Sequence, residues 1–262
     1  MENEFKLAII GGSGAYNLLD DIEYIKNFET PFGISQPFAI GYIGNKRIVY
    51  TNRHSLPGSK NFGHDIPPHR INSKALIFSI AKLKIKKIIS ILSVGSLRKE
   101  FAIGSFIVPE QFIDFTKKRD YTFFDGKFIG SEGVIIDENQ VKHIDVTKPF
   151  CDELRNLVYE KGKKLNIDIR ICGCYVCTEG PRLETPAEIA FYRNIGGDVV
   201  GMTLIPECIL AKELDICYAP VCIVTNYAAG MQEKVSLEEV KKVTKNVEGK
   251  LKLLLKNVIE EF

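Results

Sequence analysis

The sequence contains no long apolar run and no marked excess of charge of one sign. Nothing in it approaches the roughly 20 apolar residues that a membrane-spanning helix needs. Glu2 and Glu4 precede a short apolar run that soon reaches Gly11 and Gly12, which is not the layout of a signal peptide. The net charge is only +2, so the composition gives no sign of nucleic-acid or membrane binding. We therefore expect a cytoplasmic protein.

Histidine is also scarce, with 4 residues, whereas cysteine occurs 7 times. Cys172, Cys174 and Cys177 form a C-x-C-x-x-C cluster, but no second C-x-x-C pair of the zinc type accompanies it. The remaining cysteines are Cys151, Cys208, Cys217 and Cys222. The cluster lies in an apolar run, "IRICGCYVCT", where alternate cysteines would share one face of a strand. We favour buried free thiols there over a metal site or a disulfide. The Lys/Ile-rich composition also fits a thermophile, in which intracellular disulfides occur.

Repeats, low-complexity segments and linkers are absent, so we expect a single domain over residues 1–262. Short β-rich runs alternate with longer helical ones, which indicates an α/β fold: a central mixed, mostly parallel twisted β-sheet flanked by helices. Strands are expected at residues 6–12, 47–53, 86–94, 168–178, 198–202 and 218–225, and helices at 70–84, 150–165, 206–216 and 237–260. Two capping boxes, Thr185 with Glu188 around Pro186 and Ser236 with Glu239, predict further helix starts.

A glycine-rich turn after the first strand, "IIGGSGAYN" (9–17), is the first candidate for ligand binding. Its backbone N–H groups can approach an anion, and Ser13 adds a hydroxyl. The dinucleotide fingerprint fails because Asn17 stands where a third glycine is needed, and no Gly-Lys-Ser/Thr follows as in a Walker loop. A plain tight turn is an equally good interpretation.

Arg53 and His54 stand at the end of a predicted strand. Ligands of parallel α/β sheets collect at the carboxyl ends of strands, and an arginine there can grip phosphate with two parallel donors. His64 and His69 follow closely in the loop "HDIPPH". We expect these two only to order the loop.

Two further segments place polar side chains after apolar strands. "TEGPRLET" (178–185) carries Glu179, Arg182 and Glu184. Glu179 is a structural partner for Arg182, which leaves Glu184 free to face a cleft. "VTNYAAG" (224–230) places Asn226 at a strand end, where asparagine alone is often only a turn residue.

Taken together, these segments resemble the trimeric purine nucleoside phosphorylase/methylthioadenosine phosphorylase family, nearly end to end. The segments that stand in the family's order and at similar spacing are "IIGGSG", "RH", "VGSLR", "QFIDFTKKRDYTFFDG", "TEGPRLET", "GMTLIPE" and "VTNYAAG". The resemblance implies the nucleoside phosphorylase fold, a homotrimer or dimer of trimers, and cleavage of purine nucleosides by inorganic phosphate. Phosphate is then a co-substrate, and no metal or organic cofactor is needed.

The resemblance also implies a site. Phosphate would be held by Ser13, Arg53, His54, Ser93 and Thr203. The sugar and base would be contacted by Leu183, Glu184, Met202, Asn226, Ala228, Val235, Leu237, Val240 and, from a neighbouring subunit, His143. Asn226, Glu184 and His54 would be the catalytic residues. One departure is Leu92, where the family usually has a small hydroxyl residue, with Ser93 in place of alanine. One phosphate hydrogen bond is therefore moved or lost.

The preferred base follows from hydrogen-bond chemistry. A 6-oxopurine presents N1–H as a donor and O6 as an acceptor, whereas adenine presents a bare N1 and an amino group. Glu184, at the position that reads N1, accepts N1–H, and the Asn226 amide can donate to N7 and engage O6. The adenine-selective branch has aspartates at the Asn226 and Ala228 positions. A buried mismatch of this kind can cost about 10⁴ in kcat/KM, so we expect 6-oxopurine nucleosides.

The group at the sugar 5′ carbon stays open among inosine, guanosine and 5′-methylthioinosine. Val235, Leu237 and Val240 suit an apolar methylthio group, whereas Lys241, where a leucine is common, either favours a 5′-hydroxyl or points to solvent. The closest rival function is a 5′-methylthioadenosine phosphorylase. A nucleoside hydrolase, a nucleoside-binding protein without catalysis and a dinucleotide-dependent oxidoreductase are weaker alternatives.

Overall fold

The computed structural model describes residues 5–13, 15, 18–125, 129–131, 134–136 and 141–262, without the side chains of 129–131 and 134–136. The glycine-rich turn after the first strand is therefore described only in part, since Gly14, Tyr16 and Asn17 lie outside these residues. The helices are η1 (Pro68–Arg70, a 3-10 helix), α1 (Ser73–Lys82), α2 (Asp152–Lys164), α3 (Pro186–Asn194), α4 (Leu204–Glu213) and α5 (Leu237–Ile259). None of these described helices is both long and apolar enough to cross a membrane.

One large sheet forms the centre of the molecule. Its strands are β1 (Ala8–Gly11), β2 (Asp21–Lys26), β5 (Phe38–Ile43), β6 (Lys46–Asn52), β7 (Lys87–Ser96), β8 (Phe106–Val108), β9 (Gln111–Asp114), β12 (Ile169–Ile171), β13 (Cys174–Cys177), β14 (Val199–Gly201) and β15 (Cys217–Tyr227). Two short hairpins stand apart: β3 (Glu29–Thr30) with β4 (Gly33–Ile34), and β10 (Ile129–Ser131) with β11 (Val134–Ile136).

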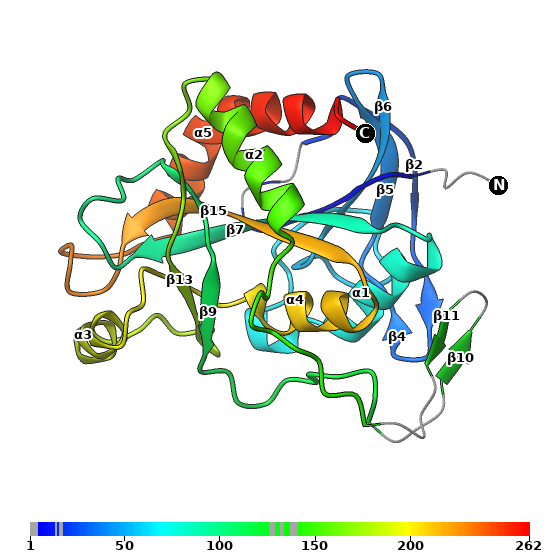
Figure 1. Ribbon diagram of the computed structural model, residues 1–262, viewed down its shortest axis with the longest axis horizontal. Helices are drawn as coiled ribbons and strands as arrows, with labels where there is room; N and C mark the ends of the chain where they lie inside the picture. Colours follow the sequence, from blue (N-terminus) through cyan, green and yellow to red (C-terminus); the bar gives the residue numbers. More distant parts are fainter. Residues whose placement is uncertain (1–4, 14, 16–17, 126–128, 132–133, 137–140) are drawn as a thin grey trace.

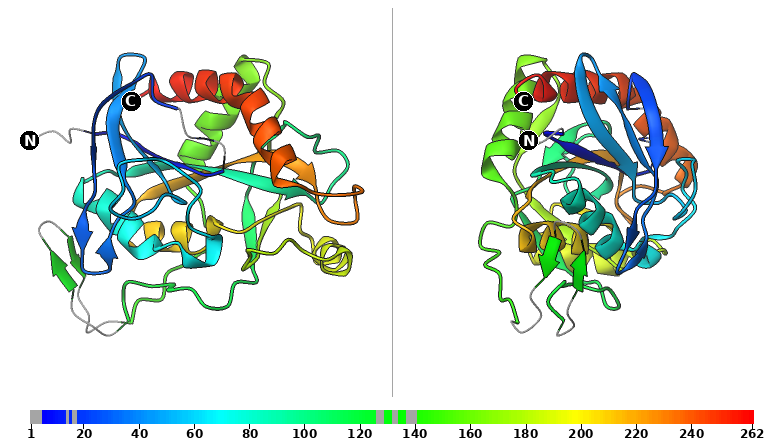
Figure 2. Two further views of the ribbon diagram at one scale, coloured as in Figure 1. Left: turned by 180° about the vertical axis from the view of Figure 1, so that it is seen from behind. Right: turned by 90° about the vertical axis from the view of Figure 1, so that its right-hand side faces the viewer.

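The strand order is β12-β8-β15-β7-β1-β6-β5-β2, and β14 joins β7 to a side branch formed with β13 and β9. The central run β15-β7-β1-β6 is parallel, whereas β5 and β2 at one edge are antiparallel. Helices α2 and α5 cover one face of the sheet, and α1 and α4 cover the other (Figures 1 and 2). The expected mixed, mostly parallel sheet flanked by helices is confirmed.

The first strand explains why the central segments read as continuous apolar runs. Successive side chains of a strand point to opposite faces, so Ala8 and Ile10 pack on the side of α1 and α4, whereas Leu7 and Ile9 pack on the side of α2 and α5. Because both faces of the sheet are covered, all four of these positions are apolar, and β1 shows no alternation of apolar and polar residues.

The prediction of a single strand over residues 168–178 is wrong. The segment forms two strands, β12 and β13, separated at Gly173, whose φ of +98° favours glycine and turns the chain. Cys172 and Cys174 therefore do not alternate along one strand as expected. All three cysteines of the cluster, including the buried Cys177, are nevertheless free, as predicted, although Cys172 and Cys174 are only half-buried.

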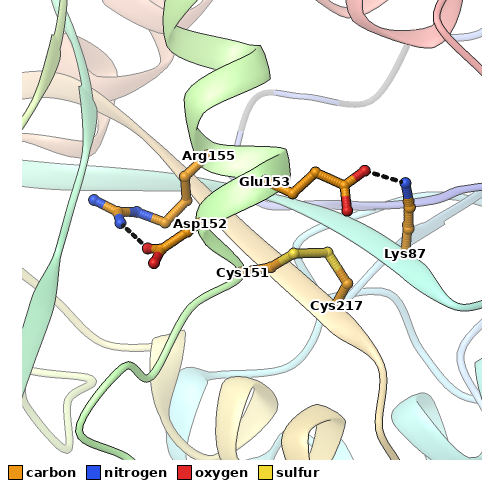
Figure 3. The surroundings of a disulfide bond; sticks show 6 residues. All are labelled: Lys87, Cys151, Asp152, Glu153, Arg155 and Cys217. Atoms are coloured by element: carbon orange, nitrogen blue, oxygen red, sulfur yellow. Dashed lines mark hydrogen bonds and ion pairs between the residues drawn. A yellow bond between two sulfur atoms is a disulfide. The ribbon is translucent and has the colours of Figure 1, made fainter.

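A disulfide that the sequence did not predict joins Cys151 to Cys217. Cys151 is the residue before the first turn of α2, and Cys217 begins β15 (Figure 3). The bond thus attaches α2 to the amino end of β15. Asn226 lies near the carboxyl end of the same strand. Lys87 on the neighbouring strand reaches Glu153 of α2, at 2.8 Å, beside the disulfide (Figure 3).

Candidate active site

A cavity of about 390 Å³ lies where β1, β6, β7 and β15 approach their carboxyl ends. These strands are parallel neighbours, so their carboxyl ends meet at one edge of the sheet, and the volume suits a small molecule. All the expected site residues except His143 line it. They are Ser13, Arg53, His54, Ser93, Leu183, Glu184, Met202, Thr203, Asn226, Ala228, Val235, Leu237 and Val240.

One end of the cavity gathers hydroxyl groups and histidines. Ser13 Oγ and His64 Nδ1 are 3.2 Å apart, and Ser93 Oγ donates to the Ser13 carbonyl, also at 3.2 Å. The rings of His54 and His64 stack with their centroids 4.0 Å apart. His64, expected only to order its loop, therefore lines the cavity, together with Asp65.

His54 is a neutral side chain with a defined tautomer. Its Nδ1 lies 2.8 Å from the Ile66 carbonyl oxygen, which can only accept, so Nδ1 carries the proton. Burial, followed by the neighbouring His64, lowers the pKa of His54 to about 3. The remaining nitrogen, Nε2, consequently presents a lone pair and can accept a hydrogen bond from a ligand.

Arg53 forms a buried ion pair with Glu207, and both side chains are only 1% exposed. Its Nε donates to Glu207 Oε1 at 2.6 Å, and its Nη2 donates to Ser90 Oγ at 2.7 Å. Burial opposes the charge of Arg53, but Glu207 outweighs this effect and raises the pKa of the guanidinium. The expected two-pronged grip on phosphate is therefore not available in this arrangement, because the side of the guanidinium that could provide it faces Glu207.

The Nη1 group of Arg53 is the part that faces the glycine-rich turn. It donates to the Ile91 carbonyl at 2.8 Å, and a Cβ added to Gly12 would lie only 2.5 Å from it. Glycine at this position therefore lets the backbone of the turn pass directly over the guanidinium. With one hydrogen of Nη1 committed to Ile91, the other is the single N–H that Arg53 can offer to the cavity.

Glu184 also lines the cavity. The Thr178 hydroxyl donates to Glu184 Oε1 at 2.7 Å. Burial raises the pKa of Glu184, and the hydrogen bond from Thr178 opposes that rise. The other carboxylate oxygen, Oε2, is thereby left to receive a donor from a ligand in the cavity.

The ion pairs around Glu184 differ from those expected. Arg182 pairs with Glu188, at 2.7 Å, instead of with Glu179. Glu188 also completes the capping box with Thr185, which confirms the predicted start of α3. Glu179 turns away and accepts from the backbone N–H of Lys117 at 2.8 Å. These pairings leave Glu184 as the acidic side chain of "TEGPRLET" that lines the cavity, as predicted.

Asn226 lines the same cavity as Glu184. Its Oδ1 accepts from the Thr225 hydroxyl at 2.9 Å, and its Nδ2 donates to the Tyr227 carbonyl at 2.9 Å. The pairing of β15 with β7 shifts register between Val224 and Asn226. Such a bulge re-aims side chains at the end of a strand, and here both Thr225 and Asn226 line the cavity. One hydrogen of Nδ2 stays available to a ligand.

A buried arginine that was not predicted from the sequence joins the segment at the end of β13 to the segment at the start of α4. Arg119 donates from Nη1 to the carbonyls of Met202, at 2.7 Å, and Ile205, at 2.5 Å. Its Nη2 donates to the carbonyls of Thr178 and Glu179 at 3.2 and 2.9 Å. Arg119 thus fixes the end of β13 against the start of α4.

The start of α5 lines the remaining wall with Val235, Leu237 and Val240. Ser236 caps the helix through the backbone N–H of Glu239, as expected, but the Glu239 carboxylate accepts from Gln232. Lys241 is exposed and does not line the cavity. Its charge is nevertheless close enough to add to burial in lowering the pKa of His64.

His143 is exposed and lies outside the cavity of its own chain. The segment that carries it is fastened to the end of α4, where Lys142 Nζ donates to the Glu213 carbonyl at 2.8 Å. The Glu213 carboxylate accepts from the Thr122 hydroxyl at 2.5 Å and from the Phe123 N–H at 2.8 Å.

Within the residues that the structure describes, no group of three or more His, Cys, Asp or Glu side chains could hold a metal ion.

The sequence around Glu207 contains a signal for its buried partner. It stands in the apolar stretch "LIPECILA", and a glutamate is almost never fully buried unless it is paired. That context demands a buried cation, which the structure identifies as Arg53. For Thr178 no comparable signal exists, since a threonine in a strand is ordinary.

The comparisons with known proteins identify the family of the chain. The sequence model of the phosphorylase superfamily matches residues 6–260. A probable 6-oxopurine nucleoside phosphorylase from Dictyoglomus turgidum is 44% identical over 95% of this chain and 89% of its own length. The S-methyl-5′-thioadenosine phosphorylase of Saccharolobus solfataricus is 40% identical over 98% of this chain and 89% of its own.

Among solved structures, methylthioadenosine phosphorylase from Schistosoma mansoni in complex with adenine superimposes with a TM-score of 0.85 at 28% identity. The superposition covers 98% of this chain and 91% of that one. Family model, relatives and fold all extend over nearly the whole sequence. The chain belongs to the phosphorylase superfamily.

Proposed function

We propose that the protein is a purine nucleoside phosphorylase, a pentosyltransferase that cleaves 6-oxopurine nucleosides with inorganic phosphate. The observation that carries the proposal is that Glu184 and Asn226 line one cavity together with Ser13, His54 and Ser93. A purine and a phosphate ion would occupy the two ends, with the sugar between them over Met202. The relatives named as 6-oxopurine nucleoside phosphorylases support this choice.

The base end provides the hydrogen bonds that a 6-oxopurine needs. Glu184 Oε2 accepts N1–H, while the free hydrogen of Asn226 Nδ2 is directed to N7 or O6. Ala228 lines the same region and provides no acceptor for the amino group of adenine. Negative charge that develops on the departing base is stabilised by the Asn226 donor.

At the other end, the hydroxyls of Ser13 and Thr203 and one N–H of Arg53 donate to phosphate, and the Ser93 hydroxyl does so once it rotates away from the Ser13 carbonyl. His54 differs from these because its Nε2 is an acceptor, so it accepts a hydrogen bond from the P–O–H group of monohydrogen phosphate. The C1′–N9 bond breaks with its electron pair on the base, and a phosphate oxygen bonds to C1′. The proton that phosphate loses balances the one that the purine gains. Positioning supplies much of the rate, and neither a metal nor an organic cofactor enters the scheme.

The alternative of a methylthioadenosine phosphorylase rests on the relatives that carry that name. The apolar wall of Val235, Leu237 and Val240 suits a 5′-methylthio group, and it does so with hypoxanthine as well as with adenine. We therefore include 5′-methylthioinosine with inosine and guanosine as substrates to be compared.

We also propose a cytoplasmic trimer in which His143 reaches the cavity of a neighbouring subunit. The support is its exposure, and that of Val141 and Val146 on either side, of which Val141 is 77% exposed. Sedimentation of the purified protein as a trimer, with loss of activity in His143→Ala, is the expected result. A monomer with full activity would remove His143 from the site.

The test of the reaction is product analysis with inosine, in the presence and absence of phosphate. We expect hypoxanthine and ribose 1-phosphate with phosphate, and no release without it. Free ribose in phosphate-free buffer would indicate a hydrolase and overturn the proposal. The variant Glu184→Ala should lose most of its activity on inosine, whereas Glu160→Ala, at an exposed position of α2 outside the cavity, is the control.

A further inference from the structure

Thr178 is a buried residue that does not line the cavity, yet its hydroxyl contacts the residue that we assign to base recognition. It is 7% exposed and directly follows β13. Its backbone N–H donates to the Gly201 carbonyl at 2.9 Å, and its carbonyl accepts from Arg119. The backbone of Thr178 is thus held from both sides, which fixes the position of its side chain.

The hydroxyl proton of Thr178 has one good acceptor. Glu184 Oε1 is 2.7 Å away, whereas the Gly201 carbonyl, which already accepts the Thr178 N–H, is at 3.5 Å. A short bond to one carboxylate oxygen stabilises the ionised carboxylate. It also determines which oxygen faces the ligand.

The charged groups around Glu184 offer little other support for its negative charge. Arg182 and Glu188 form an ion pair with each other, and their charges shift the pKa of Glu184 in opposite directions. The Tyr192 hydroxyl is a further titratable group nearby. Burial disfavours the ionised form. The opposing contributions within the protein are the Thr178 hydroxyl, the backbone N–H of Glu184 itself and the distant charge of Arg182.

We propose that Thr178 is a positioning residue that keeps Glu184 ionised and thereby sets the preference for purines that carry a hydrogen on N1. The inference rests on the proposed function and adds a determinant to it. A protonated Glu184 would present a donor, which suits the bare N1 of adenine and repels N1–H. Loss of the Thr178 hydroxyl should therefore weaken inosine cleavage and favour adenosine as the pH falls.

The test uses Thr178→Val, which keeps the shape of the side chain, and Thr178→Ser, which keeps the hydroxyl. In ligand-free protein labelled with ¹³C at the glutamate carboxyl, the titration of Glu184 is followed by NMR, and its signal is assigned with Glu184→Gln. A hydrogen bond to a charged group shifts the pKa of that group by about one to two units. We expect an upward shift of the Glu184 titration of that size in Thr178→Val, and the native midpoint in Thr178→Ser.

The kinetic readout is the pH profile of kcat/KM for inosine and for adenosine. In Thr178→Val, the acidic limb of the kcat/KM profile for inosine should shift to higher pH, together with the titration of Glu184. Activity on inosine should then approach the native value only at alkaline pH. The ratio of adenosine to inosine cleavage should rise about tenfold at the lower pH. Thr178→Ser should restore both.

An unchanged Glu184 titration in Thr178→Val would overturn the inference, whatever the activity. If the Glu184 titration shifted upward but the ratio of adenosine to inosine cleavage stayed unchanged, the role of Thr178 in base selectivity would be overturned. If the native protein released no hypoxanthine from inosine, the proposed function would fail and the selectivity with it. The NMR titration would still decide whether Thr178 holds the charge.

Discussion

The substitution Glu207→Gln would remove the only carboxylate that the structure places against the guanidinium of Arg53. In the native protein Glu207 accepts from Arg53 Nε at 2.6 Å, from the Tyr218 hydroxyl at 3.0 Å and from Ser90 Oγ at 3.2 Å. Glutamine fills the same space but carries no charge, and its amide nitrogen would face one of these donors. A cation and at least one donor would then be buried without an adequate acceptor.

Breaking a buried pair by removing one partner costs about 3–5 kcal/mol, because the other charge remains in a low-dielectric environment. For a chain of this length each kcal/mol corresponds to roughly 2–4 °C in Tm. We therefore expect Glu207→Gln to lower Tm by roughly 10 °C, with a parallel rise in the KM for phosphate as Arg53 is displaced.

The assay is urea and thermal unfolding of native protein and variant, followed by circular dichroism. The matched control is Glu248→Gln, the same substitution in a more exposed ion pair with Lys252 at 3.8 Å. An exposed pair contributes about 0–1 kcal/mol, so the control should unfold almost as the native protein does. A loss below 1 kcal/mol in Glu207→Gln would refute the assignment of a strong buried ion pair.

Three further perturbations follow from the structure. The Cys151–Cys217 disulfide joins residues separated by 66 positions, and closing such a loop is worth about 4 kcal/mol by the chain-entropy estimate; urea unfolding of the double serine variant should show that loss, and equal stability would contradict it. Because burial lowers the pKa of His54 to about 3 from its ordinary 6.5, the unfolded chain binds a proton first, so stability should fall as the pH drops from about 6.5 toward 3. His54→Asn should flatten this pH dependence, measured by Tm against pH, and an unchanged slope would count against the neutral histidine. Gly12→Ala places a Cβ 2.5 Å from Arg53 Nη1 and should cost about 1–3 kcal/mol by overpacking, whereas a variant with native Tm and native phosphate KM would show that the turn has room to move.

The sequence predicted the central strands and the helices because their signals are local. Buried parallel strands read as apolar runs, and the Thr185–Glu188 capping box marks the start of α3 within a few residues. The break at Gly173 was missed because an apolar, β-branched run on both sides of a glycine favours one continuous strand. Only the pairing of β12 with β8 and of β13 with β9 and β14 shows that the two halves belong to different parts of the sheet.

For the site, the sequence indicated which segments meet but not how their side chains pair. Parallel topology alone brings the ends of β1, β6, β7 and β15 together, which explains why the expected lining residues lie in one cavity. Partner choice is a three-dimensional property: Arg182 pairs with Glu188 of α3 because the helix brings it near, and Glu179 is turned toward Lys117. The Cys151–Cys217 pairing was equally unpredictable, since the two residues are brought together only by packing of α2 beside β15.

The decisive measurement for the selection of a 6-oxopurine by Glu184 and Asn226 is the ratio of kcat/KM for inosine to that for adenosine, at saturating phosphate and pH 7.5. The same ratio should be measured for methylthioinosine against methylthioadenosine, so that the 5′ group cannot mask the base preference. We expect the 6-oxopurine member of each pair to be cleaved at least about a hundred-fold faster, because a carboxylate opposite a bare N1 leaves a buried polar group unpaired. Equal or faster release of adenine in either pair would contradict it.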